Sequence, residues 1–334
     1  MMILARTLVA TAALLAAATA LQAQDANPAV IFDLGGKFDR SFNQASYEGA
    51  ERFKTETGIG YEEYELQNDS QREQALRRFA ERGHNPVVVA GFSYESAMTT
   101  VAPEFPDTDF VIIDAVVDQP NVRSVVFSEH EGSYIVGLLA GMASKTGKVG
   151  FVGGMDIPLI RKFACGYVQG VKAANPDAEV FQNMTGATGA GWNDPVKGGE
   201  LAKSQIDRGA DVIYHAAGGT GIGVLQAAAD AGKLGIGVDS NQNYLHPGQI
   251  LTSMLKRVDN AVHDAMADVN GGTFTPGINV MGLKEDGVGY AVDENNEKLI
   301  TPEMKAAAED AKAKIISGEI KVHDYMSDDS CPVS

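Results

Sequence analysis

Short apolar runs alternate with amphipathic stretches along almost the whole chain, and this alternation constrains the fold more than any other feature. The runs expected to form strands are 30–33, 61–66, 87–90, 110–114, 122–126, 148–153, 178–183, 212–216, 236–239 and 250–253. The stretches expected to form helices are 43–58, 71–82, 95–105, 131–145, 160–175, 194–209, 221–231 and 258–270. Because strand and helix in alternation build right-handed βαβ units, the pattern predicts an α/β fold with parallel sheets.

The same order of elements begins twice, which predicts two doubly wound parallel-sheet lobes. Residues 24–127 and 254–280 are assigned to the first lobe, and residues 128–253 and 281–334 to the second. The strand at 250–253 and the helix at 258–270 are expected to lead back to the first lobe before 288–293 returns to the second. Several such crossings would form a hinge, and the cleft between the lobes is then the natural ligand site.

The N-terminus predicts export. Arg6 precedes an uncharged run over 8–20 that gives way to small and polar residues, as in a secretory signal peptide, here assigned to 1–23. The run is shorter than the ~18 apolar residues of a spanning helix. No cysteine follows it closely, the earliest being Cys165, so we expect a soluble chain without a lipid anchor.

The net charge and the two cysteines exclude one class of ligand and allow one disulfide. A net charge of -17 argues against nucleic acid, which requires concentrated Lys and Arg. Cys165 and Cys331 can pair in an oxidising compartment and would then pin the tail to the second half of the chain. The sequence itself does not fix the distance between them.

The segment 29–49 reads as a strand, a glycine turn and a helix. Asp33 falls at the carboxyl end of the strand, where ligands of open α/β sheets bind. Ser41 is expected to cap the helix, and Phe42 with Asn43 then places a flat apolar face beside an amide. That pairing suits an aromatic ring with polar edges, such as a nucleobase. The alternative is that Phe42 belongs to the core and Asp33 to an ordinary turn.

A second glycine-rich junction spans 211–223. Asp239 lies about 20 residues beyond Gly219, as the ribose-binding acid of a Rossmann site would. The glycines at 219, 221 and 223 are wrongly spaced for that fingerprint, because Val224 stands where Gly or Ala is required. Asp239 can still accept two hydrogen bonds from a vicinal diol. Either Tyr214 or His215 can face the cleft, since side chains alternate along a strand.

Signatures of catalysis and metal binding are missing from the sequence. There is no G-x-S-x-G elbow, no phosphate-binding G-x-x-x-x-G-K-[ST] loop and no H-E-x-x-H pair, and the histidines are widely separated. We therefore expect no catalytic residue, no metal and no cofactor. A dehydrogenase or a nucleoside-cleaving enzyme is the disfavoured alternative.

Four motifs in order resemble the basic membrane protein family, the extracytoplasmic substrate-binding proteins of ABC transporters of the purine nucleoside receptor type. They are D-x-G-G-x-x-D-x-S-F-N at 33–43, the strand end at Asp114, AAGGTG at 216–221 and GVDSNQ at 237–242. The resemblance implies a type I periplasmic binding protein with a multi-crossover hinge. Such a protein would close on adenosine, guanosine or inosine and deliver it to a permease. Many members carry a lipoprotein cysteine that is missing here, so we expect a monomer that diffuses in a Gram-negative periplasm. A free purine base as ligand, or a signalling role beside a membrane receptor, remains an alternative.

The resemblance also implies roles for individual residues. Asp33 and Asn43 would contact the base edge, and Phe42 would stack on one face of the base with Tyr214 or His215 opposite. Asp114 and Asp239 would bind the ribose, Gly219 would line the sugar, and Lys256 matches the basic residue after the following strand. The alternatives are a helix cap for Asp114 and a surface ion pair for Lys256. Trp192, the only tryptophan, lies in a glycine-rich stretch and is a candidate lid. Core burial or a surface loop is the alternative for Trp192.

Overall fold

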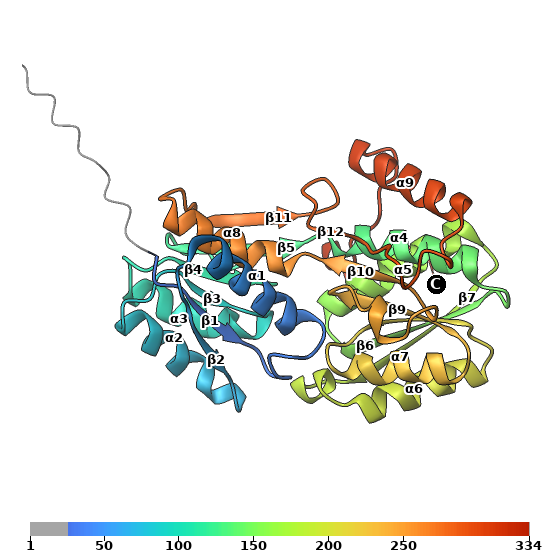
Figure 1. Cartoon of the computed structure of the whole chain (residues 1–334), viewed down its shortest axis with the longest axis horizontal. Coiled ribbons are helices and arrows are strands. Elements are labelled where there is room, and N and C mark those ends of the chain that lie inside the picture. The colour runs from blue at the N-terminus through green and yellow to red at the C-terminus, as the bar shows by residue number, and fades with distance from the viewer. Residues whose placement is uncertain (1–25, 334) are drawn as a thin grey trace, which may run out of the picture.

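The computed structural model describes residues 26–333, so the signal peptide predicted for 1–23 lies outside the described residues. Two lobes lie side by side, the first blue to cyan and the second green to yellow, and an orange segment returns to the first (Figure 1). Within 26–333, no helix has both the length and the apolar character needed to cross a membrane.

The first lobe is built on a six-stranded sheet of order β11-β5-β4-β3-β1-β2, in which every neighbouring pair is parallel. Its strands are β1 Ala29–Phe32, β2 Glu62–Glu65, β3 Val87–Val89, β4 Phe110–Ile113, β5 Val122–Phe127 and β11 Gly277–Met281. Its helices are α1 Phe42–Thr57, α2 Arg72–Glu81, α3 Glu95–Val101 and α8 Val258–Asn270.

The second lobe repeats the plan with the order β12-β10-β9-β8-β6-β7, where only β12 runs antiparallel to its neighbour. Its strands are β6 Lys148–Met155, β7 Glu179–Gly186, β8 Val212–Ala216, β9 Leu234–Asp239, β10 Ile250–Lys256 and β12 Val288–Tyr290. Its helices are α4 Glu129–Ala143, α5 Pro158–Ala174, α6 Pro195–Asp207, α7 Thr220–Asp230 and α9 Pro302–Ser317. The predicted α/β fold with two parallel sheets is confirmed.

Alternation along the strands explains the two apolar layers of each lobe. In β1, Val30 and Phe32 pack in one cluster with Phe53 of α1, whereas Ile31 faces the opposite side, where it packs in a cluster with Leu76 of α2. Because helices cover both faces of the sheet, the inner strands β1 and β3 are buried throughout and read as continuous apolar runs.

Three segments cross between the lobes: 127–129 from β5 to α4, 256–258 from β10 to α8, and 281–288 from β11 to β12. β10 itself belongs to the second sheet, so the return to the first lobe starts after it. α8 then packs closely on α1, since a Cβ on Gly49 would lie 2.2 Å from the carbonyl oxygen of Asp259. The edge strand β11 was not predicted, because four of its five residues are exposed and no apolar run marks it.

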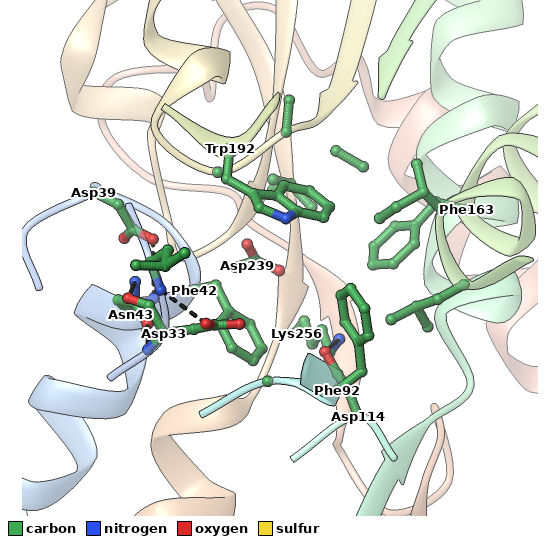
Figure 2. A pocket seen from close by; sticks show the side chains of 18 residues that line it. Asp33, Asp39, Phe42, Asn43, Phe92, Asp114, Phe163, Trp192, Asp239 and Lys256 are labelled. Carbon is green, nitrogen blue, oxygen red and sulfur yellow. Dashed lines mark hydrogen bonds and ion pairs between the residues drawn. The ribbon is translucent and has the colours of Figure 1, made fainter. Parts of the chain in front are cut away.

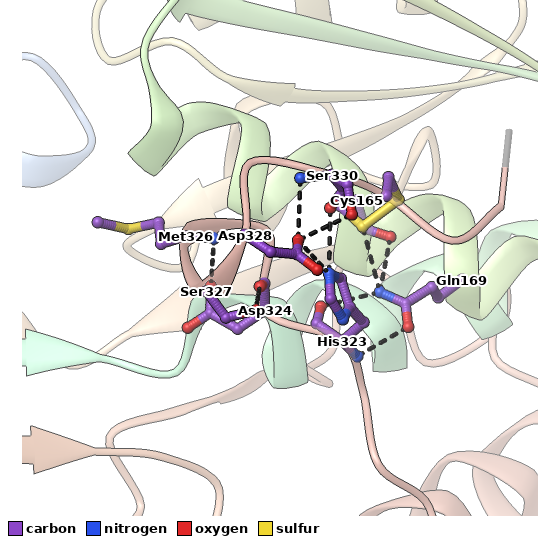
Figure 3. Close-up of a disulfide and its surroundings, with 9 residues drawn as sticks. Cys165, Gln169, His323, Asp324, Met326, Ser327, Asp328 and Ser330 are labelled. Atoms are coloured by element: carbon purple, nitrogen blue, oxygen red, sulfur yellow. Dashed lines mark hydrogen bonds and ion pairs between the residues drawn. A yellow bond between two sulfur atoms is a disulfide. The ribbon is translucent and has the colours of Figure 1, made fainter.

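A disulfide joins Cys165 of α5 to Cys331, as the sequence analysis allowed (Figure 3). Gln169 and His323 reinforce this attachment. The Gln169 side chain donates to the His323 carbonyl at 3.0 Å and accepts from the His323 amide at 2.8 Å. The C-terminal tail, residues 318–333, is therefore fixed against α5.

Candidate ligand-binding cleft

A cavity opens between the lobes, at the carboxyl ends of the strands of both sheets (Figure 2). It contains about 610 Å³ of space not filled by atoms, its open mouth included, which is in the range of roughly 300–1,000 Å³ typical of small-molecule sites. Its walls combine carboxylates, one lysine and four large aromatic rings. Of the residues predicted for the site, seven border it: Asp33, Phe42, Asn43, Asp114, Trp192, Asp239 and Lys256.

The loop between β1 and α1 presents Asp33 to the cavity. Asp33 Oδ1 accepts from the Leu34 amide at 2.8 Å and from the Arg72 guanidinium at 2.6 Å. Its Oδ2 has no hydrogen-bond partner within 26–333, and a Cβ on Gly91 would lie 2.7 Å from it. Glycine at position 91 therefore leaves space around the open oxygen of Asp33.

Asn43 holds this loop together with the amide that was predicted to contact a base. Its Nδ2 donates to the carbonyl oxygens of Asp33 at 3.1 Å and Gly36 at 3.2 Å, and its Oδ1 accepts from the Asp33 amide at 3.1 Å. Both donor hydrogens are thereby used within the loop. Asn43 borders the cavity, but its geometry favours a structural role in the turn.

Ser41 occupies the N-cap position of α1 as predicted, but the hydrogen bonds that cap the helix come from Asp39. The carboxylate of Asp39 accepts from the backbone amides of Ser41 at 2.8 Å, Asn43 at 3.0 Å and Gln44 at 3.1 Å, whereas the Ser41 side chain makes no cap hydrogen bond. Burial raises the pKa of Asp39 to about 6, although these amide bonds act against the rise.

Asp114 and Lys256 form a buried ion pair at the cavity wall. Lys256 Nζ lies 2.7 Å from Asp114 Oδ2, and the two side chains are 2% and 6% exposed. Asp114 Oδ1 is buried without a hydrogen-bond partner among the described residues. Burial raises the pKa of Asp114 to about 6 despite the neighbouring ammonium. Burial alone would lower the pKa of Lys256, but the surrounding carboxylates outweigh it and raise that pKa.

Asp239 completes the charged wall from the second lobe. Its Oδ2 accepts a short hydrogen bond from the Ser41 hydroxyl of the first lobe, and no described residue donates to its Oδ1. Burial raises the pKa of Asp239 to about 6, although Lys256 and the Ser41 bond act against the rise. Asp114 and Asp239 both border the cavity, and each has one oxygen without a hydrogen-bond partner among the described residues.

The aromatic rings come from both lobes. Phe42 opens α1, Phe92 follows β3, and Phe163 lies on α5. Trp192, the predicted lid, covers Gly154 so closely that a Cβ there would lie 2.3 Å from two carbons of the indole. Figure 2 shows these rings around the opening, with the Asp239 carboxylate between them. The arrangement suits a flat ring joined to a group with neighbouring hydroxyls.

Tyr214 and His215 do not border the cavity, so the expectation that one of them faces the ligand is not met. Tyr214 is fully buried 5.1 Å from the Tyr167 ring, centroid to centroid. His215 is fully buried on the other face of β8 and lies 2.9 Å from the side-chain oxygen of Gln242. Burial lowers the pKa of His215 to about 4, which keeps the ring neutral. The cavity begins only at the strand end, with residues 216–218.

Gly219 precedes α7 just outside the cavity, where a Cβ would lie 3.3 Å from the Trp192 carbonyl oxygen. Nine other side chains of the wall were not predicted as site residues: Leu34, Asp39, Phe92, Leu159, Ile160, Phe163, Ala216, Ala217 and Val238. Phe92 could have been found, because it lies two residues beyond the end of the strand predicted at 87–90. Phe163 gave no such signal, since its spacing is that of any buried helical residue.

Hydrogen bonds that need no ligand join the two lobes beside the cavity. Besides the Ser41 to Asp239 bond, the Ser240 hydroxyl donates to the Ser41 carbonyl at 3.0 Å and the Gln242 amide donates to the Arg40 carbonyl at 2.9 Å. These bonds attach the loop before α1 to the segment after β9. They form a latch, residues 40–41 with 239–242, that holds the lobes together.

Comparison with known proteins gives consistent matches over this architecture. A family model described as "ABC transporter substrate-binding protein PnrA-like" matches residues 26–325. The chain is 35% identical over 324 residues to the CD4+ T-cell-stimulating antigen of Listeria monocytogenes, covering 90% of this chain and 88% of that protein. It is 34% identical to the ABC transporter nucleoside-binding protein BmpA of Lactococcus lactis, covering 89% of each.

A solved structure agrees with the sequence matches. A solute-binding protein of an ABC transporter system from Aeropyrum pernix is similar with a TM-score of 0.83 at 32% identity, covering 91% of this chain and 95% of that chain. The similarity therefore includes both lobes and the cleft between them.

Proposed function

Because this chain belongs to the PnrA-like family of ABC transporter substrate-binding proteins, we propose that it binds a purine nucleoside between its lobes and delivers it to a permease. The nucleoside-binding relative of Lactococcus lactis supports the class of ligand. After export and removal of the predicted signal peptide, the protein acts as a monomer in the periplasm.

One observation carries the proposal: two buried carboxylates with open oxygens lie beside one ammonium group at the cavity. Asp114 and Asp239 each have an oxygen without a protein donor, and Lys256 has three donor hydrogens for two acid partners. The vicinal hydroxyls of a ribose donate to such oxygens and accept from such an ammonium. A ligand without hydroxyls leaves these buried groups unpaired, which costs free energy.

The rest of the cavity suits the base. The rings of Phe42 and Trp192 offer apolar faces, and a purine buried between such rings gains both from its burial and from stacking. Asp33 Oδ2 is an open acceptor, so it selects a base edge that carries an N–H group. Aromatic walls, an acceptor for the base edge and acids for the sugar together favour a whole nucleoside over its parts.

The latch explains how the ligand is retained and released. Ser41 bonds Asp239 directly, so the residue proposed to bind the sugar also holds the lobes together. Opening at the three crossings breaks these bonds and exposes the sugar-binding acids to water at the same time. We expect the closed, loaded form to be the one that the permease recognises.

A free purine base is the second candidate ligand, and the experiment separates the two. Purified protein is denatured and examined by mass spectrometry for co-purified small molecules. Adenosine, guanosine, inosine, uridine, adenine and ribose are then titrated by calorimetry. A site built to bond hydroxyls discriminates by up to roughly 10⁴ against analogues that lack them. Adenine binding as tightly as adenosine would therefore contradict the proposed sugar contacts.

A matched pair of variants isolates the charged wall. Asp114→Asn keeps the shape of the side chain and tolerates the positive φ of 72° at this position. It should weaken nucleoside binding, whereas Asp107→Asn, an exposed carboxylate of the same lobe, should not. Chromatography of the bound nucleoside after incubation checks that the ligand is returned unchanged. A cleaved product would instead support a nucleoside-cleaving enzyme.

A further inference from the structure

Glu129 is a buried acid that the proposed binding reaction does not use directly. It is the first residue of α4, its side chain is 1% exposed, and it does not border the cavity. Its carboxylate lies between two ammonium groups, with Oε1 2.9 Å from Lys256 Nζ and Oε2 3.0 Å from Lys162 Nζ. A carboxylate without accessible surface is kept only where its charge is compensated, and here both oxygens are.

The two lysines extend this contact in opposite directions. Lys256 continues to Asp114 at the cavity, at 2.7 Å, and Lys162 continues to Asp324 of the C-terminal tail, at 3.4 Å. Charges of alternating sign therefore run from the tail to the cavity wall. The tail end of this row is fixed by the disulfide at Cys331 (Figure 3).

Close helix packing sets the position of Glu129. A Cβ on Gly137 of α4 would lie 2.2 Å from the Tyr167 carbonyl oxygen, and a Cβ on Gly170 of α5 would lie 2.0 Å from the Tyr134 carbonyl oxygen. Because only glycine permits this approach, the register between α4 and α5 is fixed. Glu129 thus reaches Lys256 from a rigid support, unlike a side chain on a loop.

Glu129 determines how the ammonium of Lys256 divides its ionic contacts, because it is the second carboxylate beside that ammonium. With Glu129 in place, the ammonium is shared between two acids, and Asp114 gives it only Oδ2. Without that second acid, the ammonium would be attracted to both oxygens of Asp114, because no other described carboxylate lies within 4.0 Å of it. Oδ1 of Asp114 would then no longer be open to a ligand hydroxyl.

We infer that Glu129 is a positioning residue for sugar recognition: it holds Lys256 so that Asp114 keeps one oxygen free for a ribose hydroxyl. This inference rests on the proposed nucleoside function. Glu129 also stabilises the fold as an acid in the first turn of α4. A purely structural role and a positioning role can be distinguished by the ligand. If Glu129 acts by positioning, its substitution weakens the binding only of ligands that carry the sugar hydroxyls.

The test is Glu129→Gln, titrated by calorimetry with adenosine, guanosine and inosine and with the 2′,3′-dideoxy analogue of each. We expect roughly a tenfold or greater loss of affinity for the ribonucleosides, as for a lost hydrogen bond to a charged group, and less than about a twofold change for the dideoxy analogues. Asp268→Asn, which breaks the ion pair with Arg123 far from the cavity, should change neither.

Equal losses for both ligand series, or no loss for either, would overturn the inference while leaving the nucleoside function intact. If the wild-type protein binds no nucleoside, the proposed function fails and the role of Glu129 fails with it. Should Glu129→Gln not fold, Glu129→Asp retains the charge but withdraws it by one methylene. That variant should show an intermediate loss restricted to ribonucleosides, and an unselective loss would count against positioning.

Discussion

Asp239→Asn should make the ligand-free protein more stable while weakening its binding of nucleoside. The substitution keeps the size of the side chain, an acceptor for Ser41 and tolerance of the positive φ of 62°. Its effect on folding follows from burial, which raises the pKa of Asp239 from 3.8 to about 6. At about 1.4 kcal/mol per pKa unit, the ionised carboxylate destabilises the folded state by roughly 3 kcal/mol at neutral pH.

The pH dependence has a definite sign. Above pH 6 the folded protein contains an ionised, buried Asp239, and the asparagine variant avoids that cost. As the pH falls toward 4, the folded carboxyl takes up a proton that the unfolded chain does not yet bind, so the advantage of the variant shrinks. We expect a gain in unfolding free energy of about 3 kcal/mol at pH 7.5 and about 1 kcal/mol at pH 4.5.

Urea unfolding at the two pH values measures this gain, and calorimetric titration measures binding. Losing one charge-assisted hydrogen bond should raise the Kd for nucleoside by roughly ten- to a hundredfold. Asp107→Asn serves as the exposed control for both assays. Unchanged or reduced stability at pH 7.5 would refute the argument from burial. Undiminished affinity would refute the assignment of Asp239 to the sugar.

Three further predictions concern the walls of the cleft and the tail. Gly154→Ala should displace the Trp192 ring, because the new Cβ would lie 2.3 Å from it, and calorimetry should show nucleoside binding weakened by roughly three- to tenfold. Phe42→Leu should remove both stacking on the base and the contact of the ring with Lys256, 5.3 Å from its centroid, with a loss of about 1–2 kcal/mol in binding free energy measured in the same way. Reduction of the disulfide, which closes a separation of 166 residues, should lower the unfolding free energy by up to roughly 5 kcal/mol in chemical unfolding, whereas the double Cys→Ser variant should not respond to reductant.

Ligands of open α/β sheets bind at the carboxyl ends of the strands, and this rule explains which residues of the cleft could be predicted from the sequence. Asp33, Asp114 and Asp239 each directly follow or end a strand, so their convergence on one cavity could be read from three apolar runs. Tyr214 and His215 precede the strand end, where both faces of the sheet are covered by helices. Alternation therefore turns one to each covered face and neither to the cleft.

The hydrogen-bond and ion-pair partners of the side chains at the site could not be predicted, because they depend on contacts distant in sequence or on exact loop geometry. Ser41 was expected to cap its own helix, but it bonds Asp239, 198 residues away. Asn43 uses its amide within the turn, which only the path of residues 33–36 determines. Glu129 lies within two residues of a predicted helix, yet nothing local distinguishes it from an exposed acid.

The return of the chain to the first lobe has a consequence for the order of folding. α1 packs against α8, and the first sheet is completed by β11, so residues 26–127 alone lack one helix of this layer and one edge strand. A ribosome must therefore synthesise past residue 281 before the first lobe can close its core. By that point most of the second lobe has also been synthesised, but β12 and α9 are still missing from it. Neither lobe is therefore complete. A chain of this topology therefore completes neither lobe until most of it has been synthesised.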